Sequence, residues 1–379
     1  MLVGLADRDS PDSATADSLD ELERLAATDA IEVTDRVVQV RERPDPATYL
    51  GSGKVRELAE LTEARQADLV IADGELTPAQ VRGLEDGVGA RVVDRTGLIL
   101  DIFGEHAHSS EGKAQVELAQ LAYELPRLRG HGREMSRIGG GRVAGGAGIG
   151  VRGRGEMRLE IRRRHLRRRM RTLREQVRRT ARRREVTRGR RVRDRVPSVA
   201  ITGYTNAGKS ALLNRLAGAD AEVADVLFAT LDPLVRQVRT LDGLSYTLTD
   251  TVGFVRRLPH QLVDAFRSTL EEVTRADLAL HVVDASSPQA TQHIATVREV
   301  LREIGAQDVP ELLVLNKADL AEPEQMVTLR RLHPGAVAVS ARTGEGLGDL
   351  RKALRDHLSA LFPPVSAPTA PPAGQEGST

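Results

Sequence analysis

The sequence predicts an α/β protein made of a small N-terminal α/β domain, a long antiparallel helical hairpin and a larger, doubly wound, mostly parallel sheet. Three observations predict this class. Short apolar segments alternate with helical patterns near both ends of the chain, which is typical of parallel sheets covered by helices. An arginine-rich helical stretch separates the two alternating regions. The length of 379 residues is more than one hydrophobic core usually fills.

The first α/β domain is expected over residues 1–105. Ser18 followed three residues later by Glu21 predicts a capping box. Pro78 directly after Thr77 predicts the first turn of another helix. Helices at Ser18–Ala27 and Lys54–Ala64 are expected to alternate with buried strands at Leu2–Leu5, Val37–Val40, Leu69–Ala72 and Arg91–Val93.

The middle region, residues 106–195, is predicted to form the helical hairpin. A helix over residues 109–128 precedes a glycine-rich loop over residues 130–155, which contains eleven glycines. The second helix is expected over residues 156–184, with heptad-like apolar positions at Leu159, Leu166, Met170, Leu173 and Val177. This stripe is only about three heptads long, so it favours packing against the first helix over a coiled-coil dimer.

Charge is distributed unevenly along the chain, although its net charge is only +1. Residues 152–195 contain 21 arginines and five acidic residues, so this segment has an excess of +16 and the remainder carries −15. Such a segment favours a polyanionic partner, of which nucleic acid is the commonest. The alternative is a basic face that is simply solvated.

The second α/β domain is expected over residues 196–362, because Pro197 closes the arginine-rich helix. Residues 363–379 are rich in Pro, Ala, Gly and Ser and are predicted to be a disordered tail. Strand-like segments in the domain lie at Val199–Thr202, Leu234–Leu241, Ser245–Thr249, Leu278–Val283, Leu312–Leu315 and Ala336–Val339.

Composition excludes several classes of protein. The chain has no cysteine, so disulfide frameworks, thiolate zinc sites and cysteine nucleophiles are excluded. Its apolar fraction of 40% is typical of a globular chain. No apolar segment approaches the roughly 18 residues of a membrane span. The start MLVGLADRDS lacks the basic region of a secretory signal, so we expect a cytoplasmic protein.

The most specific motif is GYTNAGKS at residues 203–210, which fits the phosphate-binding pattern GxxxxGK[ST] in full. It follows a predicted strand and precedes a predicted helix, so its amides can surround phosphates. Lys209 is expected at the β- and γ-phosphates and Ser210 on Mg²⁺. The alternative is a glycine turn that matches by chance. A second string, Gly51–Lys54, lacks the first glycine and the hydroxyl and predicts only a turn.

Two further motifs follow in the order expected of a GTPase. Asp250-Thr-Val-Gly253 ends a strand, where the carboxylate can support Mg²⁺ through water and the glycine amide can contact the γ-phosphate. Asn316-Lys-Ala-Asp319 follows another strand, and the Asp319 carboxylate can accept hydrogen bonds from the two N–H groups that guanine presents and adenine lacks. After the next strand, Ser340 and Ala341 are expected to donate backbone N–H groups to guanine O6.

A threonine between the first two motifs completes the predicted site. Thr230, in the segment Val226–Pro233, is chosen to bind Mg²⁺ and the γ-phosphate as part of a switch, with Thr205 and Thr251 as weaker rivals. Lys209, Thr230 and Gly253 are the predicted catalytic residues, and Ser210 and Thr230 the predicted metal ligands. Nucleotide contacts are predicted at Gly203, Tyr204, Thr205, Asn206, Ala207, Gly208, Lys209, Ser210, Ala211, Phe228, Thr230, Asp250, Gly253, Asn316, Lys317, Asp319, Ser340, Ala341 and Arg342.

Phe254 follows the second motif, at a position where many GTPases have a glutamine that orients the attacking water. A phenyl ring can neither donate nor accept that hydrogen bond. We therefore expect slow GTP hydrolysis by the chain alone, with stimulation by a partner.

With these motifs, the chain resembles the HflX family of ribosome-associated GTPases. The resemblance extends from about Leu2 to Phe362. It rests on PDPATYLGSGK at 44–54, ELTPAQ at 75–80, RTGLILDIF at 95–103, EGKAQVELAQL at 111–121, LPRL at 125–128, GYTNAGKS at 203–210, FATLDP at 228–233 and DTVGF at 250–254.

The resemblance implies a GTP-dependent factor that binds the large ribosomal subunit and splits or rescues stalled ribosomes. It also implies that the glycine-rich loop contacts rRNA. The chain departs from the family at RGRGEMRLE, residues 152–160, where the family usually has a sequence such as RGPGETQLE. It also has Ala211 and Arg342 where threonine and lysine are common; neither change removes a predicted nucleotide contact.

Two alternatives remain open from the sequence. One is a GTPase of ribosome assembly, and the other is a non-catalytic RNA-binding scaffold whose nucleotide site only stabilises the fold. In each case we expect a monomer that binds guanine nucleotides with Mg²⁺.

Overall fold

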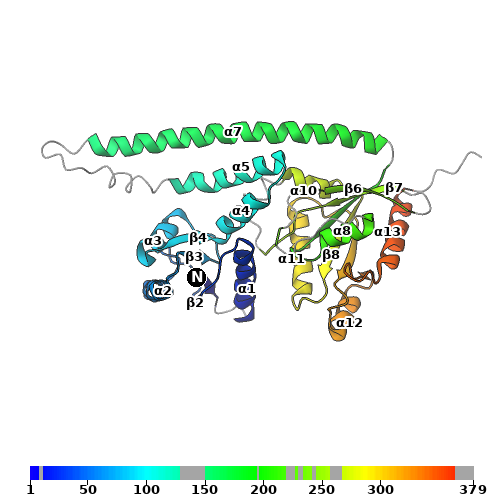
Figure 1. Ribbon diagram of the computed structural model, residues 1–379, viewed down its shortest axis with the longest axis horizontal. Helices are drawn as coiled ribbons and strands as arrows, with labels where there is room; N and C mark the ends of the chain where they lie inside the picture. Colours follow the sequence, from blue (N-terminus) through cyan, green and yellow to red (C-terminus); the bar gives the residue numbers. More distant parts are fainter. Residues whose placement is uncertain are drawn as a thin grey trace, which may run out of the picture.

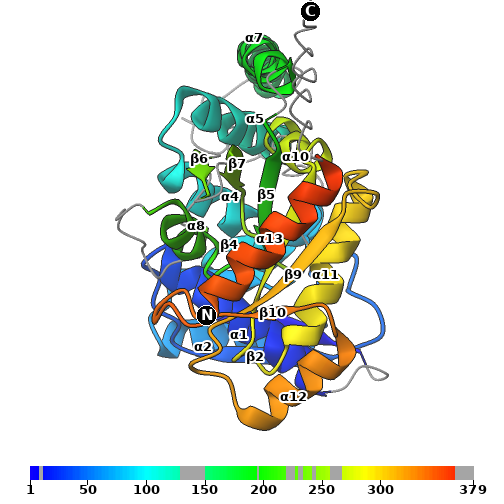
Figure 2. The ribbon, with the colours of Figure 1, turned by 90° about the vertical axis from the view of Figure 1, so that its right-hand side faces the viewer.

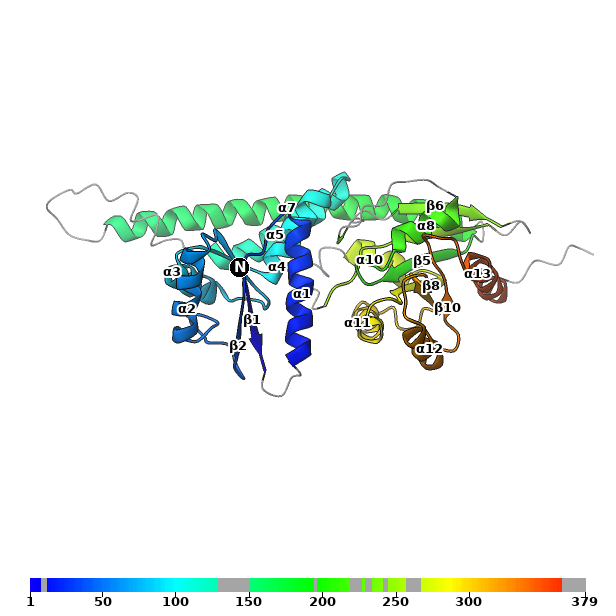
Figure 3. The same cartoon turned by 60° about the horizontal axis from the view of Figure 1, so that its bottom comes forward.

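The computed structural model describes residues 1–7, 12–128, 150–193, 196–218, 227–228, 234–240, 245–256 and 267–362. Within these residues, two β-sheets lie side by side, each covered by helices (Figure 1). The helix α7 (Gly150–Arg193) runs along both of them (Figures 1 and 3). The predicted α/β class is confirmed.

The N-terminal sheet contains four parallel strands in the order β2-β1-β3-β4. Its strands are β1 (Leu2–Ala6), β2 (Arg36–Val40), β3 (Leu69–Ala72) and β4 (Arg91–Asp94). Its helices are α1 (Asp12–Thr28), α2 (Ser52–Ala64), α3 (Pro78–Val88) and α4 (Arg95–His106). Strands and helices alternate along this part of the chain. Each helix brings the chain back to the end of the sheet at which the preceding strand began, so neighbouring strands are parallel.

Among the helices beside this sheet, one predicted start is confirmed by its capping hydrogen bonds and another predicted start is wrong. Thr77 accepts the Gln80 backbone N–H and Gln80 caps Thr77 in return, so α3 starts at Pro78 as predicted. Helix α1 instead starts at Asp12, so Ser18 and Glu21 lie inside the helix and the capping box predicted there is wrong. The Glu21 side chain turns to Arg95, with which it forms a buried ion pair at 2.9 Å.

Helix α7 packs against α5 (Ser110–Arg127) in the antiparallel sense. The side chains of Arg162 and Arg169 contact Glu124 and Glu117 at 2.6 Å, so numbers rise along one helix as they fall along the other. Among the α7 side chains that the structure describes, Leu166, Met170 and Leu173 are buried. The glycine-rich residues 130–149 lie outside the described residues.

The bounds of α7 differ from the predicted ones. Residues 150–155 are helical, not part of the loop, and the helix continues nine residues past Arg184 to Arg193. Extending an existing helix adds one hydrogen bond for each residue ordered, and Pro197 is the first proline that can stop this one.

The second sheet contains six strands in the order β10-β9-β8-β5-β7-β6. All neighbours are parallel except β6 and β7, so the sheet is mostly parallel, as predicted. Its strands are β5 (Ser198–Gly203), β6 (Leu234–Arg239), β7 (Ser245–Asp250), β8 (Leu278–Asp284), β9 (Glu311–Asn316) and β10 (Val337–Ala338). Its helices are α8 (Lys209–Ala217), α10 (Arg267–Thr274), α11 (Ala290–Glu303), α12 (Pro323–Leu332) and α13 (Leu347–Leu361).

Alternate side chains of the central strand β5 face opposite helical layers. Val199 and Ile201 belong to the core formed with α8 and α13, whereas Ala200 belongs to the core formed with α10 and α11. Helices therefore cover both faces of the sheet (Figure 2). This arrangement is the doubly wound fold, in which ligands bind beyond the carboxyl ends of the parallel strands.

The core formed with α10 and α11 also joins the N-terminal part of the chain to the second α/β domain. It includes Leu22 of α1 and Phe103 of α4 together with Phe228 and Phe254 from the second half. The rings of Phe103 and Phe228 lie 4.5 Å apart between centroids. The segment after β7 is thus packed against the N-terminal unit.

Candidate nucleotide site

The phosphate-binding motif forms a tight turn between β5 and α8. Gly203 has φ +148° and Gly208 has φ +87°, conformations that favour glycine. A Cβ on Gly203 would lie 2.2 Å from the Val282 carbonyl oxygen, and one on Gly208 would lie 2.3 Å from Asn316 Nδ2. Both glycines are therefore required by close approach as well as by backbone angle. Asn206, also at positive φ, occupies the exposed tip.

Lys209 begins α8 with its ammonium group turned back over the turn. Its Nζ donates to the Tyr204 carbonyl oxygen at 2.9 Å, and the residue is only 7% exposed. Burial lowers the pKa of Lys209 to about 8, although the Asp250 carboxylate acts in the opposite direction. A buried cation at the start of a helix is poised to bind phosphate oxygens.

Ser210 and Asp250 meet at the carboxyl edge of the sheet. The Ser210 hydroxyl donates to Asp250 Oδ2 at 2.6 Å, and Asp250 is fully buried. The pairing of β5 with β7, in which Ile201 lies opposite Asp250, brings the two motifs together. A hydroxyl and a carboxylate are oxygen donors of the kind that Mg²⁺ prefers, so these residues fit the predicted metal. Thr251, a rival for the switch position, instead donates to the Ile201 carbonyl oxygen.

The segment after Asp250 folds back over the phosphate turn. The Phe254 N–H donates to the Gly203 carbonyl oxygen at 3.1 Å, and the Thr205 N–H donates to the Phe254 carbonyl oxygen at 2.7 Å. A Cβ on Gly253 would lie 2.9 Å from Lys209 Nζ. The Phe254 side chain is 1% exposed and belongs to the shared core, so it has no access to an attacking water.

Asn316 links the third motif to the first. Its Nδ2 donates to the Ala207 carbonyl oxygen at 2.8 Å, and its Oδ1 accepts the Ala341 N–H at 3.0 Å. Lys317 has φ +59° and its Nζ forms an ion pair with Asp284 Oδ2 at 2.8 Å. The buried amide of Asn316 therefore holds three loops in register at the end of the sheet.

Asp319 lies at the rim, beside Ser340 and Arg342. Hydrogen bonding from the Ser340 side chain, and then from the Arg342 guanidinium, lowers the pKa of Asp319 and keeps it ionised. Arg342 is largely exposed, so it can leave the carboxylate when another donor arrives. The backbone N–H groups of Ser340 and Ala341 donate to Glu345 O and Asn316 Oδ1 in this conformation; their contact with guanine O6 stays a prediction.

The remaining predicted residues lie at varying distances from the turn. Phe228 is buried at φ +59° against Phe103, and Ala211 packs partly buried in the core under α8. Thr230, the predicted switch threonine, lies outside the described residues. The structure brings together the three segments that contain Lys209 and Ser210, Asp250, and Asn316.

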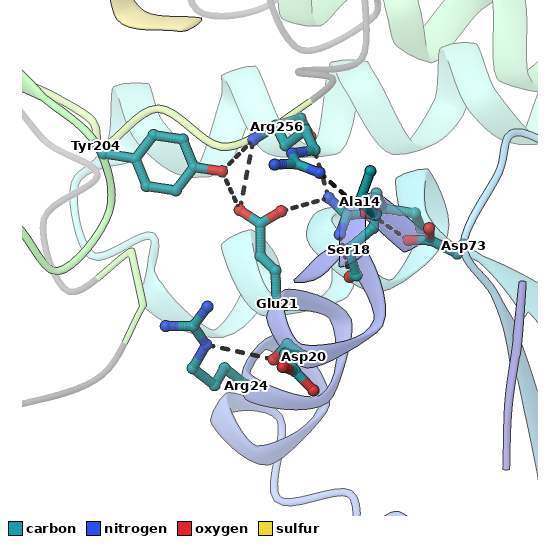
Figure 4. Close-up of polar contacts among 9 residues, drawn as sticks. Ala14, Ser18, Asp20, Glu21, Arg24, Asp73, Tyr204 and Arg256 are labelled. Atoms are coloured by element: carbon teal, nitrogen blue, oxygen red, sulfur yellow. Dashed lines mark hydrogen bonds and ion pairs between the residues drawn. The ribbon is translucent and has the colours of Figure 1, made fainter. Parts of the chain in front are cut away.

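Sequence reasoning missed a set of N-terminal side chains next to the phosphate turn (Figure 4). The Tyr204 hydroxyl donates to Glu21, and the Arg256 backbone N–H donates to the Tyr204 hydroxyl at 2.7 Å. Arg95 joins Glu21 to Asp73. The sequence contained one signal for this cluster, because Asp73 and Arg95 closely follow the predicted strands Leu69–Ala72 and Arg91–Val93. Glu21, however, was assigned to a helix cap.

Three family models match the chain in consecutive segments. They are described as GTP-binding GTPase N-terminal at residues 16–104, GTP-binding GTPase Middle Region at residues 106–191 and 50S ribosome-binding GTPase at residues 198–317. The GTPase HflX of Caldanaerobacter subterraneus subsp. tengcongensis is 48% identical over 354 residues, covering 92% of this chain and 80% of the relative. The chain belongs to the HflX family of GTPases.

A second GTPase HflX among the relatives supports the same conclusion. The GTPase HflX of Escherichia coli strain K12 is 43% identical over 345 residues, covering 90% of this chain and 79% of the relative. A solved structure of a GTP-binding protein from Sulfolobus solfataricus in complex with GDP is 24% identical, has a TM-score of 0.47 and covers 95% of this chain and 99% of that one. As an HflX-family GTPase, the chain binds GTP and hydrolyses it. In the described part of the chain, no helix combines the length and apolar character needed to cross a membrane.

Proposed function

We propose that this HflX-family GTPase is a GTP-dependent switch that binds the large ribosomal subunit in the cytoplasm and promotes splitting or rescue of stalled ribosomes. The observation that carries the proposal is the combination of a ribosome-binding GTPase model over residues 198–317 with an exposed arginine helix beside it. A monomer is sufficient for this role, because one chain contains both parts.

The surface of α7 supports an rRNA partner. Its exposed arginines include Arg167, Arg168, Arg171 and Arg174. The buried side chains Leu166, Met170 and Leu173 hold the helix on the protein, which leaves these guanidinium groups directed to solvent. Contacts between arginine and phosphate release counterions, so binding is expected to weaken steeply with salt. A helix of 44 residues is about 66 Å long at 1.5 Å per residue, long enough to follow an extended phosphate backbone.

The nucleotide chemistry follows from the residues of the site. Lys209 offsets phosphate charge, the Gly253 N–H contacts the γ-phosphate, and Asp319 selects guanine. Ser210 and Thr230 would hold Mg²⁺, with Asp250 supporting it through water; when bound, the ion neutralises charge that develops on the phosphates. Water attacks the γ-phosphorus and the products are GDP and phosphate. The buried ring of Phe254 cannot orient that water, so hydrolysis is expected to be slow until a partner assembles the site.

Co-sedimentation tests the partner. The full chain should pellet with mature large subunits in the presence of a non-hydrolysable GTP analogue and much less with GDP. The variant R167E/R168E/R171E should lose pelleting, whereas R330E/R331E, which changes exposed arginines on α12, should retain it. Equal pelleting with both nucleotides would contradict a GTP-dependent switch.

The same preparation separates the alternatives. Preference for precursor subunits would favour a role in assembly over rescue. Absence of ribosome-stimulated phosphate release would favour a scaffold. Rapid hydrolysis by the isolated chain would contradict the expectation from Phe254. Dissociation of whole ribosomes into subunits on a sucrose gradient, seen only with GTP or its analogue, would support splitting.

A further inference from the structure

Arg215, in the last turn of α8, holds the loop that is predicted to contact guanine. Its Nε donates to the Ala341 carbonyl oxygen at 2.9 Å, and its Nη2 donates to the Arg342 carbonyl oxygen at 2.7 Å. Both N–H groups belong to one rigid, planar guanidinium, and they bind two successive carbonyl oxygens. Arg215 therefore fixes both the position and the orientation of this part of the loop.

The same part of the loop is also held from the side of the nucleotide motifs. The Ala341 N–H donates to Asn316 Oδ1 at 3.0 Å. The Ala341 side chain is buried and belongs to the core that contains Leu212 and Leu216 of α8. Because its N–H and its carbonyl oxygen have different partners, Ala341 has little freedom to rotate, and the direction of its N–H depends on Arg215.

The turn that follows is closed by its own hydrogen bonds. The Gly344 N–H donates to the Ser340 carbonyl oxygen at 2.9 Å, and the Thr343 N–H donates to Ser340 Oγ at 3.0 Å. Neither bond involves the two carbonyl oxygens that Arg215 binds. The turn can thus stay closed without Arg215, whereas the direction of the Ala341 and Arg342 peptides cannot be set by the turn alone.

Helix α8 connects this contact to the phosphate site. The helix begins at Lys209, and Arg215 lies about 9 Å further along its axis. The carbonyl oxygens of a last helical turn lack partners within the helix. The Arg215 carbonyl oxygen accepts from Arg351 Nη2 at 3.1 Å, which attaches the end of α8 to α13, the helix that follows the loop. One helix therefore positions a lysine at the phosphates and an arginine at the base loop.

We propose that Arg215 is a positioning residue for guanine recognition. It acts through the carbonyl oxygens of Ala341 and Arg342 to keep the backbone N–H groups of Ser340 and Ala341 directed at guanine O6. The proposal rests on the predicted guanine contact of this loop and not on ribosome binding. Nucleotide affinity of the isolated full chain therefore tests it separately from any role on the ribosome.

Three nucleoside diphosphates that differ only in the base separate a contact at O6 from a general effect. GDP and inosine diphosphate both have O6, whereas the diphosphate of 2,6-diaminopurine riboside has an amino group in its place. Arg215→Ala should weaken binding of GDP and of inosine diphosphate by the same factor, about tenfold, because the hydrogen bond to O6 is misaligned in both. Affinity for the diaminopurine nucleotide should fall by no more than about twofold. Displacement of labelled GDP measures all three affinities.

The matched control is Arg351→Ala. It removes an arginine from the same contact between α8 and α13 but leaves both loop carbonyl oxygens bound to Arg215. GDP affinity of this control should stay within about twofold of the wild type. Arg215→Lys replaces the two-pronged guanidinium by a single ammonium group, so its GDP affinity should fall by an intermediate factor of about three.

Steady-state kinetics provide a second readout. For Arg215→Ala the KM for GTP should rise while kcat at saturating GTP stays at the wild-type value, because the loop contacts the base and not the γ-phosphate. An equal loss of affinity for all three diphosphates would overturn the proposal, since it would indicate a general effect on the fold. An equal loss in Arg351→Ala, or unchanged GDP affinity in a folded Arg215→Ala protein, would also overturn it.

Discussion

One sheet of this protein is wholly parallel and the other mostly parallel, but the two use the polar residues at their strand ends differently. Asp94 ends β4 in the first sheet and Asp250 ends β7 in the second, and both are fully buried. Asp94 accepts from Gly97 N, Leu76 N, the Tyr123 hydroxyl and Arg127 Nη2, all between 2.7 and 2.9 Å. These hydrogen bonds tie β4 to the segment before α3, to α4 and to α5, and none of them reaches the second sheet, so its role is structural.

Asp250 lies in a different environment. It contacts the Ser210 hydroxyl and influences the buried Lys209 ammonium, and both belong to a turn with glycines at positive φ. An acidic residue at a strand end therefore does not by itself indicate a ligand site. A phosphate site also needs a neighbouring glycine turn whose backbone amides and lysine can bind the phosphates.

The largest difference between the strand-end acids of the two sheets is expected in the free energy of unfolding of the Asp94→Ala variant. Removing this carboxylate leaves Arg127 and three other donors without their acceptor, so the free energy of unfolding should fall by about 3–5 kcal/mol. GDP affinity of the folded protein should stay within about twofold of the wild type. Urea denaturation measures the loss, and Glu124→Ala, which removes an exposed partner of Arg162, serves as the control with a loss below about 1 kcal/mol. A small loss for Asp94→Ala would contradict its structural role.

Asp319→Ala should instead weaken nucleotide binding and leave the stability of the fold nearly unchanged. The guanine N–H donors would lose their acceptor, so GDP should bind about 100-fold more weakly and the preference over ADP should largely disappear. The free energy of unfolding without nucleotide should change little, because Asp319 is at the rim and pairs with an exposed arginine. Calorimetry at millimolar Mg²⁺ measures the affinities, with the exposed Asp308→Ala as the control. Retained discrimination against ADP would show that guanine is recognised elsewhere.

A smaller effect should appear in the pH dependence of GDP binding. In the free protein the pKa of Lys209 is about 8, below its ordinary value, and bound phosphates favour the protonated form. Affinity is therefore fully present below pH 8 and is lost as the pH rises above it. The dissociation constant should increase about fourfold between pH 7 and pH 8.5. Calorimetry in buffers of different ionisation enthalpy should detect proton uptake at pH 8.5, and binding without such uptake would contradict this assignment.

Much of the site could be predicted because its signals are local. The phosphate motif needs a strand, a glycine turn and a helix start in sequence, and β5, Gly203–Gly208 and α8 occur in that order. Asn316 belongs to a motif that was predicted to lie at the nucleotide, and its bond to the Ala207 carbonyl oxygen ties that motif to the phosphate turn. The start of α3 was equally local, since Thr77, Pro78 and Gln80 lie within four positions.

The wrong predictions concern features that depend on contacts or on energies beyond a few neighbouring residues. Ser18 and Glu21 have the spacing of a helix cap, but Glu21 bonds to Tyr204, 183 positions away. The start of α7 was placed too late, because the glycines at its beginning have a low helix propensity. The stabilisation gained by extending an existing helix is cooperative, so it cannot be inferred from any one residue.

By itself, the sequence determined the alternation of strands and helices, the phosphate turn, the choice of guanine and the concentration of arginine in one helix. These features depend on residue type and on spacing over a few positions, which local backbone preference and hydrogen bonding translate directly into structure. Only the tertiary structure decided that the segment following Asp250 is fastened to helix α1 through Tyr204, Arg95 and Arg256. Such a contact depends on which buried side chains come together once the chain has folded. The spacing of these residues along the sequence does not indicate which of them will meet.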